Sequence, residues 1–342
     1  MHQALLDYAL FLAKAVTCVA AVAAVIVLGA GLVRSARQEG GERLEVKHLN
    51  QRLRRLAEVL NHELLSEAQQ KKERKRLKQE EKARSRAAEA GDTRRPRLFV
   101  LDFEGDIEAS RVGGLREEIS ALLQVAQAQD EVLLRLESAG GVVHGYGLAA
   151  SQLRRIREHG LRLTVAIDKV AASGGYMMAC VADHIAAAPF AIVGSIGVVA
   201  QLPNFNRLLR EHKIDYELHT AGEYKRTLTL FGENGEAARE KFRQELEETH
   251  GLFKSFVAAN RPQVSLAEVA TGEHWYGSRA LALKLVDELS TSDDLLLRKV
   301  KDAEVYELRY KQRRNLRQQL LGGLGRLAGR GQPLWQRALG PL

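Results

Sequence analysis

The chain has 342 residues, of which 45% are hydrophobic, so it has the material for a sizeable buried core. Its two cysteines, Cys18 and Cys180, exclude a disulfide framework and a metal cluster of the CxxC kind. The formal net charge of +8 is concentrated, because residues 34–97 alone carry 19 lysines and arginines against 11 acidic residues. The remainder of the chain is neutral, which excludes a protein that is basic over its whole surface.

The C-terminal end of the chain is basic as well. Residues 308–342 hold eight basic side chains and no acidic one. Neither basic segment contains interleaved aromatics, zinc-ligand spacing or an RNA-binding signature, so we expect no nucleic-acid partner. Anionic lipid headgroups are the favoured partner of such segments beside a membrane.

A long apolar run near the N-terminus predicts a membrane anchor. Residues 15–33, AVTCVAAVAAVIVLGAGLV, contain no charged side chain and meet the roughly 20-residue length that crosses a bilayer. The alternative is a cleaved signal peptide, but Asp7 and a single lysine, Lys14, precede the run, and the run exceeds the usual signal-peptide core. We therefore predict an N-terminal segment, residues 1–33, with one transmembrane helix.

A charged stretch follows the predicted span. Its first basic residues, from Arg34 to Lys47, place this side of the membrane in the cytoplasm by the positive-inside rule. Residues 42–90 contain no glycine or proline and are rich in charged residues, leucine and alanine. This composition is typical of a solvated helical arm or a disordered linker, which we predict for residues 34–96.

From residue 97 onward, short apolar runs alternate with amphipathic stretches. Such alternation is typical of βαβ units and a largely parallel sheet. We predict one α/β domain over residues 97–300, followed by a basic C-terminal tail over residues 301–342. The expected strands are 98–103, 131–137, 161–167, 184–189 and 216–220, and the expected helices are 114–128, 147–159, 203–212 and 236–260, with a last turn and helix in 272–289.

A glycine-rich turn follows the second of these strands. Residues 137–147, ESAGGVVHGYG, contain four glycines in eleven residues, and such a turn lets the backbone approach a ligand closely. The alternative is a plain tight turn at a strand end. A functional role requires a partner elsewhere in the chain.

Ser173 is the candidate partner. In VAASGGYMMACVAD, residues 170–183, it stands at a turn before an apolar helix and is followed by two glycines. The partial positive charge at a helix N-terminus, about half a unit, stabilises developing negative charge, and the N–H of Gly174 is placed to donate to an oxyanion. The alternative is a serine that only caps the helix.

A serine nucleophile needs a base. The sequence VGSIG around Ser195 lacks the first glycine of a GxSxG elbow, which excludes the α/β-hydrolase interpretation. His144 and His184 leave a Ser-His-Asp site open. Lysine also deprotonates serine when burial among apolar groups lowers its pKa. Lys225, in HTAGEYKRTLTL (219–230), follows a predicted strand and a glycine turn, although on its own it is also consistent with a surface lysine.

The strand-Gly-Gly turn, ASGGYMMA, VGSIGV and GEYK occur in this order, and together they resemble the signal peptide peptidase A family, peptidase family S49. The resemblance runs from about residue 97 to residue 290, and strings such as DKVAASGGYMMACVAD, APFAIVGSIGVVAQ, KRTLTL and TGEHWYG resemble its SohB branch. It implies a ClpP/crotonase-like domain behind one N-terminal transmembrane helix. It also implies a Ser/Lys dyad with the lysine about fifty residues after the serine, and 52 residues separate Ser173 from Lys225.

The resemblance also assigns roles to individual residues. Ser173 is the nucleophile, Lys225 the base, Ser195 the residue that holds the lysine in place, and Gly141 and Gly174 the oxyanion-hole donors. The chain is then expected to be a membrane-anchored serine endopeptidase of the bacterial inner membrane that acts without a metal or organic cofactor. Its expected partners are the lipid bilayer, peptide substrates such as signal-peptide remnants or membrane-associated polypeptides, and further copies of itself in a homo-oligomer. The family is associated with cleavage at or across the membrane, whereas the basic flank indicates a cytoplasmic body, so the side stays open.

One residue departs from the family pattern. The family's turn is usually Ser-Pro-Gly-Gly, whereas this chain has Ser138-Ala139-Gly140-Gly141. Proline fixes φ near −65°, and alanine adopts the same angle without being restricted to it, so we expect a looser turn and a mild loss of catalytic efficiency. Ala139 also supports the competing hypothesis of a non-catalytic membrane scaffold that binds peptides or partner proteins. A second alternative is hydrolysis of esters or thioesters at the same site.

Overall fold

The computed structural model describes residues 10–17, 19, 43–89 and 95–311. The chain divides into two units, residues 45–309 and residues 1–44 together with 310–342, and the fold is that of the first unit. Within the described residues no helix is both long enough and apolar enough to cross a bilayer. Most of the predicted span, namely residue 18 and residues 20–33, lies outside the described ranges, so the anchor stays a prediction.

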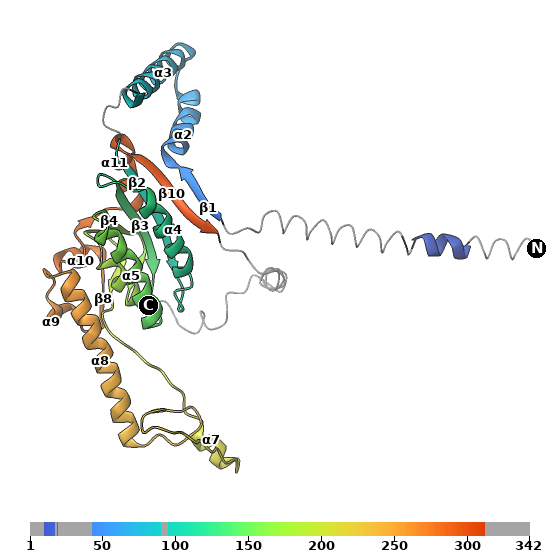
Figure 1. Cartoon of the computed structure of the whole chain (residues 1–342), viewed down its shortest axis with the longest axis vertical. Coiled ribbons are helices and arrows are strands. Elements are labelled where there is room, and N and C mark those ends of the chain that lie inside the picture. Colours follow the sequence, from blue (N-terminus) through green and yellow to red (C-terminus); the bar gives the residue numbers. More distant parts are fainter. Residues whose placement is uncertain (1–9, 18, 20–42, 90–94, 312–342) are drawn as a thin grey trace, which may run out of the picture. The chain divides into compact units, whose positions relative to one another are not determined.

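The described residues contain ten strands in a single sheet with the order β1-β10-β2-β3-β4-β6-β9, and β5, β7 and β8 branch from β3. Figure 1 shows β1, β10, β2, β3 and β4 of this order. The pairs from β10 to β9 and along β3-β5-β7 are parallel, and β8 joins β7 antiparallel. The predicted α/β class with a largely parallel sheet is thus confirmed. The strands are β1 Arg43–His48, β2 Arg97–Gly105, β3 Glu131–Ser138, β4 Arg162–Ile167, β5 Val170–Ala172, β6 His184–Ala187, β7 Ile192–Gly194, β8 His274–Tyr276, β9 Glu288–Leu289 and β10 Glu304–Lys311.

Helices connect these strands, and α4, α5, α6 and the end of α8 pack with the main core cluster on one face of the sheet. Apolar side chains three and four residues apart line the buried sides of α4 and α5, as in Leu115, Ile119 and Leu122, and join the main core cluster. The end of α8 contributes Phe253 and Val257 to the same cluster. The helices are α2 Leu49–Leu64, α3 Glu67–Glu89, α4 Val112–Val125, α5 Val143–Glu158, α6 Gly174–Ala179, α7 Asn206–Glu211, α8 Glu236–Asn260, α9 Leu266–Val269, α10 Gly277–Ala282 and α11 Ser292–Asp302.

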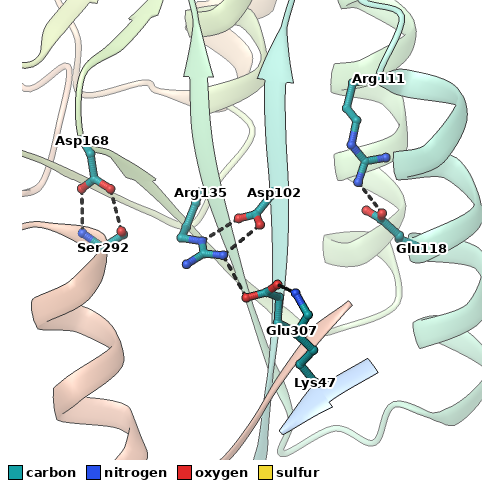
Figure 2. Close-up of polar contacts among 8 residues, drawn as sticks. All are labelled: Lys47, Asp102, Arg111, Glu118, Arg135, Asp168, Ser292 and Glu307. Atoms are coloured by element: carbon teal, nitrogen blue, oxygen red, sulfur yellow. Dashed lines mark hydrogen bonds and ion pairs between the residues drawn. The ribbon is translucent and has the colours of Figure 1, made fainter. Parts of the chain in front are cut away.

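The opposite face of the sheet is apolar at one end and charged further along. Alternation along the strands places Val100 and Leu133 in a smaller cluster with Leu296 of α11. Two residues further on, Asp102 and Arg135 are register partners and form a bidentate ion pair with distances of 2.6 and 2.8 Å (Figure 2).

Glu307 on β10 extends this pair into a network. Its carboxylate accepts from Arg135 at 3.3 Å and from Lys47 on β1 at 3.0 Å, as Figure 2 shows. Figure 2 also shows Asp168, the residue after β4, which accepts hydrogen bonds from the amide and hydroxyl of Ser292 at 2.8 and 2.6 Å. These bonds hold the start of α11 beside the end of β4. These contacts tie the two ends of the described unit to the central strands.

Several elements differ from the sequence prediction. The expected strand 216–220 is wrong, because these residues are exposed and pair with no strand of the described chain. β10 lies inside the predicted tail 301–342, where its pairing with β2 is a long-range contact that local patterning does not reveal. β1 lies inside the predicted arm 34–96 and pairs with β10, whereas α2 and α3 agree with the helical alternative for this arm.

Candidate active site

Ser173 lies at a sharp backbone turn between β5 and α6. Its φ of 52° and ψ of −120° place a non-glycine residue in a conformation that costs of the order of 1–3 kcal/mol. The turn is held from both sides, because the Ser173 amide donates to the Gly194 carbonyl at 2.8 Å and its carbonyl accepts from the Met177 amide at 3.0 Å. The hydroxyl makes no capping hydrogen bond, so the helix-cap alternative for Ser173 is not what the structure shows.

Ser173 is the accessible point of an otherwise buried run. Residues 171–182 are all buried except Ser173, which is half-buried. The glycines that follow allow this close packing: a Cβ on Gly174 would lie 2.4 Å from Cγ of Tyr146, and one on Gly175 would lie 2.5 Å from the Ser138 carbonyl oxygen. α6 therefore begins with its backbone pressed against β3 and α5, and the serine hydroxyl remains at the surface.

The glycine turn after β3 meets Ser173 directly. Gly140 has a φ of +91°, and a Cβ there would lie 2.7 Å from Cβ of Ser173 and 2.8 Å from the nitrogen of Gly174. At Gly141 a Cβ would lie 2.1 Å from the Ile107 carbonyl oxygen. A side chain at Gly140 would push the turn away from Ser173, and one at Gly141 would collide with the Ile107 backbone, so the turn is more than a plain connection.

A cavity of about 80 Å³ opens beside Ser173. Ser173, Gly141 and Gly174 line it together, so the structure brings three of the predicted site residues to one place. No histidine of the described residues lines this cavity, and His184 pairs with Glu288 at 3.1 Å instead, which weighs against a Ser-His-Asp site. The remaining lining residues are small or apolar apart from one threonine: Val143, Met177, Gly197, Val198, Val199, Thr249 and Phe253.

Ser195 lies at a second positive-φ turn next to that of Ser173. In the parallel pair of β5 and β7, Ala172 is in register with Gly194, so Ser173 and Ser195 are the residues that directly follow the two paired strands. Ser195 has a φ of 53°, and its amide donates to the Glu273 carbonyl at 2.7 Å. Its backbone thus adjoins the Ser173 turn, and the three residues Gly197 to Val199 continue from it into the cavity wall.

Lys225 is not brought to Ser173 in this structure. It is exposed, its amide donates to the Gly222 carbonyl at 3.2 Å, and it does not line the cavity. The adjacent Tyr224 ring lies 5.2 Å from Nζ of Lys241 on α8. Lys241 precedes the cavity residue Thr249 by eight positions, which corresponds to roughly 12 Å along a helix. The structure therefore does not bring together the two residues of the predicted dyad.

Two regions of the sequence match described peptidase families. Residues 3–153 match the family described as peptidase family S49 N-terminal, and residues 155–306 match peptidase family S49. The chain is 50% identical to a probable protease SohB of Haemophilus influenzae over 329 residues, which covers 92% of each chain. The chain belongs to peptidase family S49.

Further similarities involve shorter parts of the S49 chain. A probable protease SohB of Buchnera aphidicola subsp. Acyrthosiphon pisum is 61% identical over 220 residues, or 64% of this chain and 66% of the relative. Among solved structures, a 1510-N membrane-bound stomatin-specific protease matches with a TM-score of 0.42 and 12% identity, covering 63% of this chain and 98% of that one. The S49 assignment rests on the relatives of high identity.

Some residues at the S49 site were missed by the sequence analysis. Tyr146 lies within the glycine-rich stretch 137–147, which the sequence predicts to be a turn, yet its ring lies against Gly174. Thr249 and Phe253 come from α8, whose length the sequence predicts but whose contact with Ser173 it does not. The four-residue spacing of these two side chains, which puts them on one helix face, was the available signal.

Proposed function

We propose that this S49 protein is a membrane-anchored serine endopeptidase with Ser173 as its nucleophile, built on a domain of the ClpP/crotonase type. The observation that carries the proposal is the strained, accessible Ser173 turn that shares a cavity with Gly141 and Gly174. Strain of this kind persists only where surrounding contacts enforce it, and such residues cluster at active sites.

In the proposed acylation step, Oγ of Ser173 attacks the scissile carbonyl carbon while Lys225, in its neutral form, takes the hydroxyl proton. The carbonyl oxygen becomes an oxyanion that accepts hydrogen bonds from the amides of Gly141 and Gly174. Each such donor contributes about 10²–10³-fold to the rate. Collapse of the intermediate expels the amine, which takes the proton from the lysine and leaves an acyl ester on Ser173.

The deacylation step reverses these roles. Lys225 takes a proton from a water molecule, the resulting hydroxide attacks the ester carbonyl, and a second oxyanion forms in the same hole. Collapse breaks the bond to Oγ, Ser173 recovers its proton from the lysine, and a carboxylic acid product leaves. Ser195 is proposed to hold the lysine ammonium in position between these steps, and its turn adjoins that of Ser173.

The distance between Lys225 and the cavity supports a homo-oligomer as the active form. The segment 198–235 carries exposed apolar side chains that the described chain leaves uncovered, and burying them against another copy would be favourable. Assembly would also give the segment a fixed position from which Lys225 reaches Ser173. The exposed side chains are Val199, Leu202, Phe205, Leu208, Ile214, Tyr216, Leu218, Tyr224, Leu230 and Phe231.

The proposed substrates are extended peptides close to a bilayer, such as signal-peptide remnants or segments of membrane-associated polypeptides. The apolar residues 15–33 are proposed to anchor the protein in the bacterial inner membrane. The cavity beside Ser173 supports a small apolar side chain at the cleaved residue, because its volume is only about 80 Å³ and most of its lining residues are glycines, valines, Met177 and Phe253.

An activity-based probe tests the proposal. A fluorophosphonate should label the full-length protein in native membranes at Ser173, as located by mass spectrometry, and the same preparation should cleave an internally quenched peptide. Labelling elsewhere, or cleavage that survives complete labelling of Ser173, would disprove the assignment. A protein that neither labels nor cleaves would support the scaffold alternative, and activity on acyl esters with none on peptides would support the esterase alternative.

Extraction tests the anchor separately. The full chain should stay with membranes in high salt, because burial of a spanning helix is insensitive to screening whereas attachment of a basic patch is not. A variant lacking residues 1–33 should be released. If that variant binds membranes at low salt and leaves them at high salt, the basic segments bind lipid on their own.

A further inference from the structure

A chain of hydrogen bonds runs beneath the glycine turn of the Ser173 site. The Tyr146 hydroxyl lies 2.8 Å from the Asp106 carbonyl oxygen and 2.5 Å from Oγ of Ser138, which in turn lies 3.1 Å from the Gly140 nitrogen. A carbonyl only accepts and an amide N–H only donates, so both hydroxyl protons are assigned. Gly140 donates to Ser138, Ser138 donates to Tyr146, and Tyr146 donates to Asp106.

The central bond of this chain, between Ser138 and Tyr146, is buried, and the bonds at its two ends are partly buried. The side chains of Tyr146 and Ser138 are 0% and 2% exposed. Burial raises the pKa of Tyr146 above its ordinary value, more than the hydrogen bond with Ser138 lowers it, so the phenol keeps the proton that it donates. Hydrogen bonds in such a low-dielectric setting are stronger than in water and reinforce one another.

The Tyr146 ring touches the other half of the proposed oxyanion hole. A Cβ on Gly174 would lie 2.4, 2.7 and 2.8 Å from three carbon atoms of Tyr146, so the backbone that carries the Gly174 amide rests on this side chain. The hydroxyl, through Ser138 and Gly140, holds the turn that leads to Gly141. Tyr146 therefore touches Gly174 with its ring and, through Ser138, supports the turn that carries Gly141.

We propose that Tyr146 is a positioning residue that sets the distance between the Gly141 and Gly174 amides and so shapes the oxyanion hole. The proposal rests on the proposed function of Ser173, Gly141 and Gly174. Preorganised donors stabilise a transition state only where they are fixed at its oxyanion, and a misplacement of about 1 Å costs about 10²-fold in rate. Ala139 makes this support more necessary, because the turn lacks the proline that would restrict its backbone.

Tyr146→Phe in the full-length protein tests the proposal, because it removes the hydroxyl and leaves the ring under Gly174. We expect kcat for peptide cleavage to fall by about 10–100-fold with KM within about twofold, since the lost interaction acts on the transition state. Tyr176→Phe is the matched control. Tyr176 is also 0% exposed, and its hydroxyl donates to the Leu285 carbonyl at 3.0 Å, away from the turn. The Tyr176→Phe variant should lose about as much thermal stability as Tyr146→Phe and retain a kcat within about threefold of the parent.

Ser138→Ala provides a second variant that interrupts the same chain of bonds. Its loss of kcat should resemble that of Tyr146→Phe, and the double variant should lose little more than either one, because both remove the same support. A peptide boronic acid, which forms a tetrahedral adduct with the serine, should bind the two variants more weakly by the same factor as kcat falls. When Ser173→Ala is added to the parent and to each variant to prevent cleavage, the affinity for a substrate-like peptide should be the same in all of them.

The possible results separate this proposal from the proposed function. If the parent and Tyr176→Phe cleave peptides and Tyr146→Phe retains a kcat within threefold of the parent, Tyr146 does not position the hole. The same conclusion follows if Tyr146→Phe and Tyr176→Phe lose equal activity, or if KM alone changes. If the parent itself neither cleaves peptides nor binds the boronic acid, the proposed function fails and this proposal fails with it.

Discussion

Ser173 and Lys225, the two residues of the proposed dyad, lie in regions built in opposite ways. Around Ser173, residues 171–182 are buried except the serine, and the backbone conformation is fixed by glycines in direct contact with neighbouring strands and helices. Around Lys225, residues 210–226 are all exposed, and no strand forms in this part of the described chain. One half of the site is made by the fold of a single chain, whereas the other half lacks the packing that would fix it.

Under the proposed function, this difference predicts low activity of an isolated chain. A serine with preformed amide donors but no base reacts slowly, so delivery of Lys225 becomes the step that completes the site. The following experiments test each region and the connection between them.

The largest expected effect comes from the preformed region. Ser173→Ala should lower peptide cleavage by about 10³-fold or more, because it removes the nucleophile. Its melting temperature should stay close to that of the parent, because alanine at the same positive φ bears similar strain and the serine side chain makes no capping bond. Cleavage at a rate comparable to that of the parent would show that another residue is the nucleophile.

The next largest effect comes from the exposed region. Lys225→Ala and Lys225→Arg should both be nearly inactive, because neither side chain can take the serine proton near neutral pH. In the parent, acylation by an active-site probe should accelerate as pH rises, and this dependence should be absent from both variants. Survival of acylation in Lys225→Ala would remove Lys225 from the mechanism.

Lys169 is the matched control, since it is only four residues before the nucleophile. Its Nζ pairs with Glu137 at 2.9 Å, and the hydrogen bond to that carboxylate raises the pKa of Lys169, which keeps it protonated and unsuitable as a base. Lys169→Ala should retain most activity. Loss of acylation in Lys169→Ala together with survival in Lys225→Ala would reverse the assignment.

Mixed oligomers determine which copy supplies the lysine. Subunits carrying Ser173→Ala and subunits carrying Lys225→Ala should each be inactive alone. If Lys225 acts on the serine of a neighbouring copy, mixing them restores active sites, and cleavage recovers to a substantial fraction of the parent rate. Without recovery in verified mixed assemblies, the segment must fold back onto its own chain.

A pair of apolar substitutions separates activity from stability. Phe231 lies 39% exposed between Phe205 and Tyr216, with ring centroids 6.0 and 5.8 Å away. Phe231→Ala should lower cleavage by about tenfold with less than about 1 kcal/mol of stability lost, because it loosens the segment that carries Lys225 without affecting the core. Activity assays and urea unfolding measure the two effects.

The control for this pair is Leu153→Ala on α5, which is fully buried. It should cost about 2–5 kcal/mol of unfolding free energy by leaving a cavity, yet retain kcat below its melting temperature. If Phe231→Ala destabilises the protein as much as Leu153→Ala, the exposed segment belongs to the same cooperative unit as the core, and the contrast between the two regions fails.

The smallest expected effect concerns Ala139. Ala139→Pro should raise stability by about 0.4–1 kcal/mol and increase kcat by less than tenfold, because it restricts the unfolded chain and the turn. Thermal unfolding and steady-state kinetics measure both. A loss of activity would show that the backbone of this turn differs from the proline-compatible conformation that the family pattern implies.

Much of the fold could be predicted from local patterns. Apolar runs predict the strands around Val100, Leu133 and Val165, and helical periodicity predicts the helix 236–260. Residues 216–220 show the limit of this reasoning, since they have strand-like composition but pair with no strand in the part of the chain that the structure describes. β10 shows the converse, because only its pairing with β2 makes it a strand of the sheet.

The sequence by itself determined the family, the α/β class and the likeness of the Ser173 and glycine-turn motifs to a hydrolytic site, because these are encoded in short strings and local periodicity. Only the tertiary structure decided that Gly141, Gly174 and Ser173 share one cavity, that Tyr146 lies beneath both glycine segments, and that Lys225 stays apart from them. The physical reason is that local patterns fix which face of an element is apolar, whereas the approach of two backbones to within contact distance depends on packing among residues far apart in the chain. A spacing of 52 residues can identify a lysine, but only packing can bring it to its serine.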